Sequence, residues 1–201
     1  SISLSSSQTE YDVKYYRIAI RVDISNQLIY GDVTMMAESL IDGLNAVELN
    51  LDTNLIIDSV YIPGQSLNYT HSQNRLIINL DKSYNRSSIL SVSVCYHGHP
   101  GLDGFTGFYF NIRDSIPIVY TLSEPYSARV WWPCKDRPDD KADSADIIIT
   151  CDSSYYCASN GKLIDSFLNG DQKTFYYSVR YPIATYLISI AISDYAVNKI
   201  Y

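Results

Sequence analysis

The sequence has few histidines and few cysteines, and the patterns that usually mark a catalytic centre are missing. Its three histidines are His71, His97 and His99, and none belongs to a His-Glu-x-x-His pattern, which would place two imidazoles on one helix face around a metal. The Gly-x-Ser-x-Gly, phosphate-loop and dinucleotide-binding patterns are also absent. The residues of this chain therefore predict no catalytic residue and no metal site of its own.

No apolar run approaches the roughly 18 residues that a membrane helix needs. The most apolar stretch, Tyr186–Ile192, has the length of a strand and is interrupted by Ser189. A signal-peptide pattern is missing as well. We predict no membrane span, and we expect residues 1–10, which are mostly polar, to be a disordered or trimmed N-terminal stretch.

Positive charge is in short supply. The chain carries 15 basic and 22 acidic residues, for a formal net charge of −7. Nucleic-acid binding needs a basic patch that releases counterions from phosphates, so we predict no nucleic-acid partner. Lys14, Arg17 and Arg21 lie beside Asp12 and Asp23, which is typical of a mixed, solvated sheet face.

Helical periodicity is almost absent, and alternation with a period of two takes its place. In the first clear example, apolar residues at even positions from Tyr16 to Ile24 face polar residues at odd positions, which predicts a strand with one buried face. About a dozen such segments, separated by turn residues, predict an all-β fold: an antiparallel sandwich or curved sheet. We expect a single domain over 11–201, with a long irregular loop over 123–144, where Pro, Asp, Lys and Arg are frequent.

The four cysteines contain no Cys-x-x-Cys pair, so the spacing of a structural zinc site is absent. Cys95 lies in a strand pattern and is expected to be a small buried residue. Cys151 and Cys157 flank a predicted turn, and the sequence leaves open whether they form a disulfide. Cys134 could act as a nucleophile only beside a histidine, and a buried thiol is the commoner outcome.

Two polar clusters have both a chemical and a structural interpretation. His97 and His99 would share one face of an extended segment, and with Asp103 they could bind a metal. Their Gly- and Pro-rich surroundings favour a simpler role as polar loop residues. Asp139 and Asp140 are adjacent in a charged loop, where a solvated, salt-bridging surface is the default.

Tyrosine is unusually frequent, with 19 residues. Its ring packs on a pleated surface while the hydroxyl stays in water, so tyrosine-rich strands are typical of β proteins. Tyrosine-rich exposed faces also form ligand-binding surfaces. An alternative function is therefore a stand-alone tyrosine-rich β-sandwich that binds a glycan or a protein.

One segment carries a more specific signal. Residues 121–138 read Thr-Leu-Ser-Glu-Pro-Tyr-Ser-Ala-Arg-Val-Trp-Trp-Pro-Cys-Lys-Asp-Arg-Pro, and Lys141 follows. This resembles the pattern T-Q-x-E/Q-x-x-x-A-R-x-x-x-P-C-x-D-x-P of the aminopeptidase N and leukotriene hydrolase family. Four shorter matches occur in the family's order: 11–20 resembles its first strand, and the others are Gly-Asp-Val-Thr at 31–34, Gly-Phe-Tyr at 107–109 and Ala-Ser-Asn-Gly at 158–161.

The resemblance implies that this chain is the saddle-shaped N-terminal β-domain of a zinc aminopeptidase, a non-catalytic cap on a thermolysin-like catalytic domain. It implies that the zinc ligands follow Tyr201 in the parent protein, so that this chain carries no cofactor and is inactive alone. Peptide N-termini are the expected partners, through the missing catalytic domain. The motif variants look most like secreted bacterial members, so an extracellular or periplasmic location is expected.

The resemblance also assigns roles to residues of the irregular segment. Glu124 matches the acidic or amide residue that binds the free α-ammonium group of a peptide substrate, where a carboxylate gains from a paired cation. Leu122 replaces the usual Gln in the pocket for the first side chain, and Tyr126 is a candidate to line the cleft. Arg129, Asp136 and Lys141 are expected to brace the segment.

Overall fold

A computed structural model describes residues 6–196. Within this range the chain forms β-strands and three short 3-10 helices but no α-helix, which confirms the predicted all-β class. The helices are η1 (Ser6–Thr9), η2 (Ala128–Val130) and η3 (Thr185–Leu187), and no helix in this part of the chain has the length and apolarity to cross a membrane. The strands are β1 (Tyr11–Asp23), β2 (Leu28–Ser39), β3 (Leu44–Asn50), β4 (Leu55–Ile62), β5 (Gln65–Ser66), β6 (Tyr69–Ser72), β7 (Arg75–Tyr84), β8 (Ile89–Gly98), β9 (Leu102–Asp103), β10 (Thr106–Arg113), β11 (Ile116–Leu122), β12 (Ser144–Asp152), β13 (Tyr156–Ser159), β14 (Lys162–Asn169), β15 (Gln172–Val179) and β16 (Ile190–Ser193).

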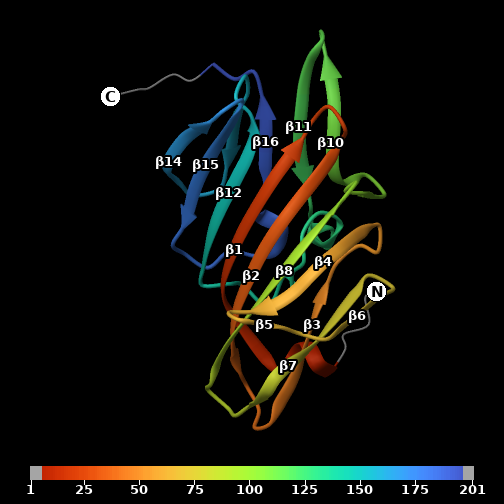
Figure 1. Ribbon diagram of the computed structural model, residues 1–201, viewed down its shortest axis with the longest axis vertical. Coiled ribbons are helices and arrows are strands. Elements are labelled where there is room, and N and C mark those ends of the chain that lie inside the picture. Colours follow the sequence, from red (N-terminus) through yellow and green to blue (C-terminus); the bar gives the residue numbers. More distant parts are fainter. Residues whose placement is uncertain (1–5, 197–201) are drawn as a thin grey trace.

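Eight strands form one large, open sheet in the order β14-β15-β12-β1-β2-β8-β4-β5 (Figure 1). Its centre is the long antiparallel pair β1 and β2, in which Ile18 lies opposite Val33. Alternate residues of β1 from Tyr16 to Val22 are buried, and those between them are partly exposed. The predicted strand with one buried face is therefore confirmed, because successive side chains of a strand point to opposite faces.

One pairing in the large sheet differs from the predicted antiparallel arrangement. β12 runs parallel to β1, with Ile147 beside Ile18, whereas its other neighbour, β15, is antiparallel to it. Parallel neighbours need a long connection. Residues 24–143 connect β1 to β12, and the irregular segment between β11 and β12 is the last part of this connection. This segment returns the chain to the start of β1, where Ser144 pairs with Tyr15.

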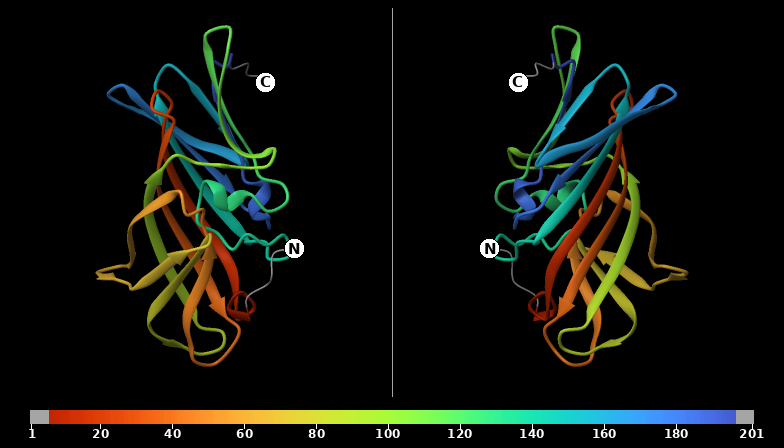
Figure 2. Two further views of the ribbon diagram at one scale, coloured as in Figure 1. Left: turned by 90° about the vertical axis from the view of Figure 1, so that its right-hand side faces the viewer. Right: turned by 90° about the vertical axis from the view of Figure 1, so that its left-hand side faces the viewer.

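Two smaller sheets complete the domain. Five strands form a sheet in the order β13-β16-β11-β10-β9, and three form another in the order β3-β7-β6. They lie toward opposite ends of the large sheet, with the β10–β11 hairpin projecting at one end (Figure 2). Buried residues from all three sheets form one hydrophobic cluster within residues 6–196.

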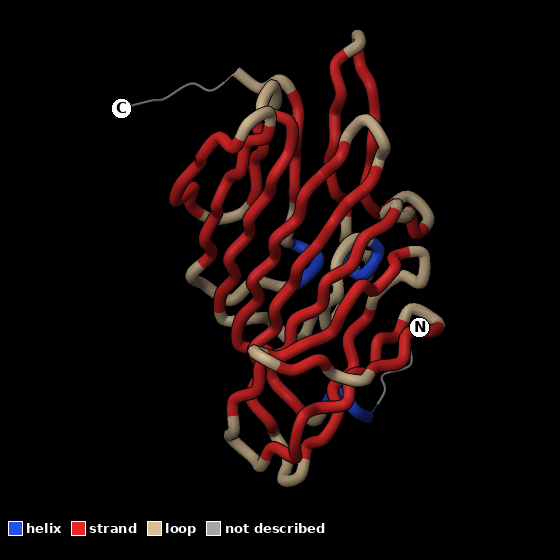
Figure 3. The backbone as a smooth tube through the Cα atoms, viewed as in Figure 1, coloured by secondary structure: helices blue, strands red, loops and turns tan. Residues whose placement is uncertain are grey.

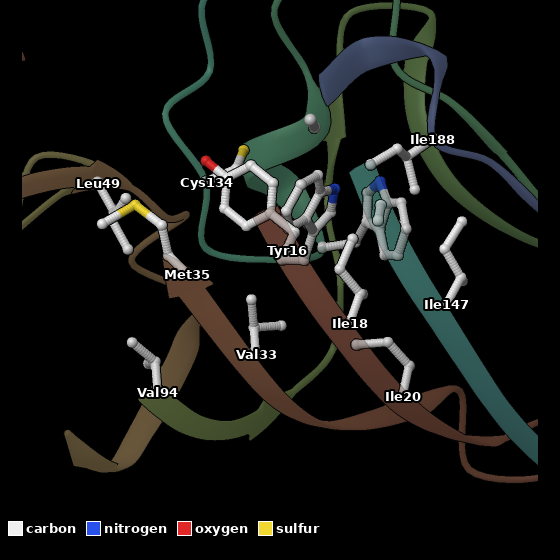
Figure 4. Packing of buried hydrophobic residues seen from close by; sticks show 14 of the residues in the cluster. Tyr16, Ile18, Ile20, Val33, Met35, Leu49, Val94, Cys134, Ile147 and Ile188 are labelled. Carbon is white, nitrogen blue, oxygen red and sulfur yellow. The ribbon is translucent and has the colours of Figure 1, made fainter. Parts of the chain in front are cut away.

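The irregular segment after β11 packs against this core at about the mid-height of the domain (Figure 2). Figure 3 shows it as a long loop among strands joined mostly by short turns. Trp131 and Trp132 are fully buried, and the Trp132 ring meets Tyr16 edge to face with 4.9 Å between ring centroids. Cys134 lies beside Tyr16 in the same part of the core (Figure 4). The segment is therefore irregular in backbone but belongs to the interior of the domain.

The second half of the N-terminal stretch is ordered, contrary to the expected disorder. η1 begins at Ser6, and Gln8 is only 3% exposed. The Gln8 side-chain nitrogen donates a 2.8 Å hydrogen bond to Asn50 Oδ1, which attaches η1 to the end of β3. Residues 1–5 lie outside the described range.

All four cysteines are free. Cys151 and Cys157, which the sequence left as a possible disulfide, are both buried thiols in β12 and β13, and burial raises the pKa of the Cys151 thiol to about 11. Cys95 is half-buried rather than fully buried, because it lies at a position of β8 that faces away from the core.

Candidate functional site

The predicted site residues lie on a turn at the end of β11. The chain leaves the five-stranded sheet at Ser123, and the backbone N–H of Ser127 donates a 2.9 Å hydrogen bond to the Ser123 carbonyl. Both serines are buried. Leu122 and Tyr126 are each 43% exposed, and Glu124 is exposed as well. In this turn the two serine side chains are therefore buried, and the three predicted site residues are exposed to solvent.

Each inward serine is fixed by a side-chain contact. The Trp131 indole N–H donates a 3.1 Å hydrogen bond to Ser123 Oγ, and Ser127 Oγ lies 2.6 Å from Thr106 Oγ1. The first contact ties the turn to the buried irregular segment, and the second ties it to the start of β10. The backbone at Glu124 is therefore held from two sides, although its own side chain is not used to hold it.

The Glu124 side chain has no partner among the described residues. Among residues 6–196, no hydrogen bond or ion pair joins its carboxylate to another residue. Pro125 follows Glu124 in the turn, and the peptide bond between them is cis. An unpaired, solvent-facing carboxylate on a fixed turn can accept hydrogen bonds from a ligand cation.

Exposed apolar side chains, which the sequence did not predict as site residues, lie next to this turn. Gly107 of β10 pairs with Leu122 on one side and with Leu102 on the other. Leu102 is 57% exposed, and Phe105, in the turn between β9 and β10, is 82% exposed. A Cβ at Gly107 would lie 2.5 Å from the Gly101 carbonyl oxygen, so glycine is required where these strands meet. Only the strand pairing reveals this neighbourhood, because the loop sequence has no alternation to predict it.

Arg129 and Asp136 brace the segment behind the turn, as expected. Arg129 pairs with Asp136 at 3.5 Å and also with Asp103. The other Asp136 oxygen accepts a 3.3 Å hydrogen bond from the Thr185 hydroxyl in η3. Burial raises the pKa of Asp136 to about 6, against the lowering effect of the hydrogen bond from the Arg129 N–H and of the Arg129 charge.

A second brace replaces the one expected at Lys141. Lys141 is exposed and forms no ion pair within the described residues, whereas Lys135 is buried. The Lys135 ammonium donates a 2.7 Å hydrogen bond to the Tyr11 carbonyl and pairs with Asp140. Asp140 was expected to be solvated, but its side chain is only 9% exposed. Asp139 fits the solvated prediction and pairs with Arg137.

The long motif and one of the shorter motifs meet at the start of β16. The Thr121 hydroxyl accepts a 3.0 Å hydrogen bond from the Ile190 N–H, and Asn160 Oδ1 accepts one of 2.7 Å from the Ser189 N–H. Thr121 and Asn160 are 39 positions apart in the sequence, yet both hold the strand that lies beside β11. These motif residues therefore position the sheet from which the Glu124 turn emerges.

The structure does not bring together the residues of the possible His97–His99–Asp103 metal site or of a Cys134–histidine nucleophile pair. The His97 ring contacts Asp58 at 2.9 Å, the His99 ring contacts the Gln27 carbonyl, and Asp103 pairs with Arg129. Within residues 6–196, no group of three His, Cys, Asp or Glu side chains is placed to hold a metal ion, so these residues do not fit a zinc site. Cys134 is fully buried, and burial raises the pKa of its thiol well above the usual value, which removes the thiolate that a nucleophile needs.

The outer face of the large sheet does not present its tyrosines as an open binding surface. The Tyr15 hydroxyl donates to Asp146 at 2.9 Å, and the Tyr61 hydroxyl lies 3.4 Å from Asp32. The Tyr30 ring is covered by the Arg21 guanidinium, whose central carbon lies 3.7 Å from the ring centroid. These tyrosines are half-buried and bonded to neighbouring strands, as in the simpler structural interpretation of the tyrosine content.

Comparison with known proteins agrees with this architecture. Three solved structures of an M1 zinc metallopeptidase from Deinococcus radiodurans share the fold. One has a TM-score of 0.81 and 21% identity over 91% of this chain, and a variant has 0.83 and 22% over 95%. The same variant bound to a Tyr-Ser-Ala substrate has a TM-score of 0.82 and 22% identity over 92%. This chain covers 42 to 44% of those chains, so it spans less than half of their length.

The sequence profile of the peptidase M1 N-terminal domain matches residues 12–187. The match takes in most of the chain, from the second residue of β1 to the end of η3, and it contains the Glu124 turn and both braces. The chain belongs to the peptidase M1 N-terminal domain family.

Proposed function

We propose that this chain is the substrate-gating cap of a zinc aminopeptidase, in which Glu124 binds the α-ammonium group of a peptide substrate. The observation that carries the proposal is the state of Glu124: a carboxylate without a protein partner, exposed on a turn that two buried serines hold in place. A side chain whose only role was structural would be expected to pair with a neighbour, as Asp136 and Asp140 do.

The solved relatives support the ligand class. The Deinococcus radiodurans variant is described as bound to a Tyr-Ser-Ala substrate, and two structures of a two-domain M1 zinc metallopeptidase variant are described as bound to L-tryptophan and to L-arginine. These ligands differ in side chain and share a free α-amino group, so a site that recognises all three can do so through the ammonium. Those proteins are zinc metallopeptidases, and we assign the zinc of the present protein to a catalytic domain outside this chain.

The surroundings of Glu124 fit the position that this role requires. Leu122 and Tyr126 are exposed on either side of Glu124 in the sequence of this turn, and in this proposal they contact the first side chain of a peptide whose ammonium is held by Glu124. Fixing the ammonium sets which peptide bond reaches the catalytic groups, which is a contribution of positioning rather than of chemistry. The apolar Leu122 favours an apolar first residue.

The test uses the full-length protein that contains this chain, with a substrate bearing a free amino terminus and its N-acetylated counterpart. A charge-assisted hydrogen bond is worth about 1.5–3 kcal/mol, so Glu124→Ala should lower kcat/KM for the free-amine substrate by about 10- to 100-fold. Glu124→Gln keeps a hydrogen-bond acceptor but loses the charge, so its kcat/KM should lie between the values of the wild-type protein and Glu124→Ala.

The ratio between the two substrates distinguishes recognition from general damage. Wild-type protein should prefer the free amine, and Glu124→Ala should lose most of that preference. Asp114→Ala serves as the matched control, because Asp114 is an exposed carboxylate at the tip of the β10–β11 hairpin. An unchanged preference in Glu124→Ala, or an equal loss in Asp114→Ala, would contradict the proposal.

A further inference from the structure

A separate cavity lies at the end of the domain from which the β10–β11 hairpin projects. The β1–β2 turn and the β14–β15 turn reach the same end (Figures 1 and 2), and the turn between β12 and β13 completes the lining. Its volume is about 510 Å³, within the range of small-ligand sites. Pro117 lines this cavity and Leu122 lies at the other end of β11, so about 17 Å of strand separates the cavity from the Glu124 turn.

The inner wall of the cavity is apolar. Ile24, Phe110 and Tyr155 contribute to the lining and also pack against the hydrophobic core. Each is only partly buried, because the two sheets that they join diverge at this end. The apolar wall of the cavity is therefore held in place by the core, and its other side faces the cavity. Burial of a ligand's apolar body against this wall would be favourable.

The rim of the cavity is acidic. Asp23 and Asp152 are the last residues of β1 and β12, and Asp171 lies in the β14–β15 turn. None of the three forms an ion pair with another residue of the range 6–196. Asp23 accepts hydrogen bonds from Asn26, and these lower the pKa of its carboxyl. Asp152 accepts one from the Ser154 N–H, with the same effect on its pKa. Both carboxylates are consequently charged at neutral pH.

One basic residue, Arg21, lines the cavity. Its guanidinium stacks on the Tyr30 ring, and its positive charge also helps to lower the pKa of the Asp23 carboxyl. Arg21 therefore offsets part of the negative charge at the rim, but the three aspartates outnumber it, which favours a positive ligand there. A metal ion does not fit this arrangement, since no three acidic, His or Cys side chains in the described residues converge closely enough to hold one.

We propose that this cavity binds an organic cation: a positively charged group on an apolar body, of the size of an arginine or lysine side chain. The apolar body would rest on Ile24, Phe110 and Tyr155, and the cation would lie among the aspartates of the rim. The site is independent of Glu124, because it lies at the opposite end of β11 and shares no residue with the turn.

The test is a calorimetric titration of the full-length protein with benzamidine, which carries an amidinium on an aromatic ring. Benzamide is the neutral probe of nearly the same shape. Every titration is carried out in the Glu124→Ala background, so that binding at the proposed substrate site does not contribute. Benzamidine should bind with a stoichiometry near one, and benzamide at least about tenfold more weakly, because charge at the rim supplies the difference.

Variants then locate the binding. Asp152→Asn combined with Asp171→Asn should weaken benzamidine binding about tenfold or more, while Asp143→Asn, an exposed carboxylate away from the cavity, should leave it unchanged. Unfolding midpoints of the variants check that the fold is intact. Equal affinity for the two probes, or an unaltered affinity in the double variant, would overturn the proposal.

Discussion

Replacing Gly31 with alanine in β2 is expected to destabilise the domain by about 3 kcal/mol. Gly31 lies opposite Tyr96 across the β2–β8 pair, and the Tyr96 ring lies over it. A Cβ at Gly31 would be 2.2 Å from two carbons of that ring, where ordinary contacts begin near 3.4 Å. The ring would have to move by more than 1 Å.

Any movement of the Tyr96 ring would disturb its packing or its hydrogen bond. Tyr96 is 1% exposed, and its hydroxyl donates a 2.7 Å hydrogen bond to the Trp131 carbonyl. Overfilling a packed core costs about 1–3 kcal/mol, and a buried carbonyl left without its donor costs about 1–3 kcal/mol more. The two effects are linked through the same ring, so we take about 3 kcal/mol as the combined value. The hydrogen bond also explains the glycine itself: Tyr96 reaches the irregular segment by crossing the backbone of β2.

Urea denaturation followed by circular dichroism measures the effect, and a double-mutant cycle tests the reason. In a Tyr96→Leu background the ring is absent, so Gly31→Ala should cost less than about 1 kcal/mol, giving a coupling energy of about 2–3 kcal/mol. Gly101→Ala is the matched control, because its Cβ would meet nothing closer than 3.7 Å. A cost at Gly31 that does not depend on Tyr96 would refute the argument.

Three further outcomes are expected. Lys135→Met should destabilise the chain by about 3–5 kcal/mol, because it leaves Asp140 as an uncompensated buried charge, and adding Asp140→Leu should recover most of the loss in denaturant unfolding. Burial raises the folded-state pKa of Asp136 to about 6, so protonation of this carboxyl favours the folded state. The free energy of unfolding should therefore fall by up to about 3 kcal/mol as the pH rises from 4 to 6. Asp136→Asn should flatten this pH dependence in unfolding curves measured across the same range. The isolated chain should fold, bind no stoichiometric zinc by metal analysis and hydrolyse no aminoacyl anilide; zinc-dependent turnover by the purified chain would show that its own residues form a catalytic site.

The pattern of side chains along the sequence was enough to predict the class of fold and the buried face of the central strand. Alternation is a local property, because a strand turns successive side chains to opposite faces wherever its partners lie. The motif around Glu124 was also visible locally, and the resemblance that it carries agrees with the family found by comparison. Leu122, Glu124 and Tyr126 are exposed while the two serines between and beside them are buried, and the sequence shows these serines only as polar residues.

The tertiary structure alone decided which polar residues are buried. Asp139 and Asp140 look equivalent in sequence, but only Asp140 lies beside Lys135, whose ammonium also reaches the Tyr11 carbonyl 124 positions away. The parallel direction of β12 and the attachment of η1 to the end of β3 likewise depend on partners that are distant in the chain. A charged or polar side chain is buried only where such partners offset its loss of hydration. These partners are distant in the sequence, so they cannot be identified from the local sequence.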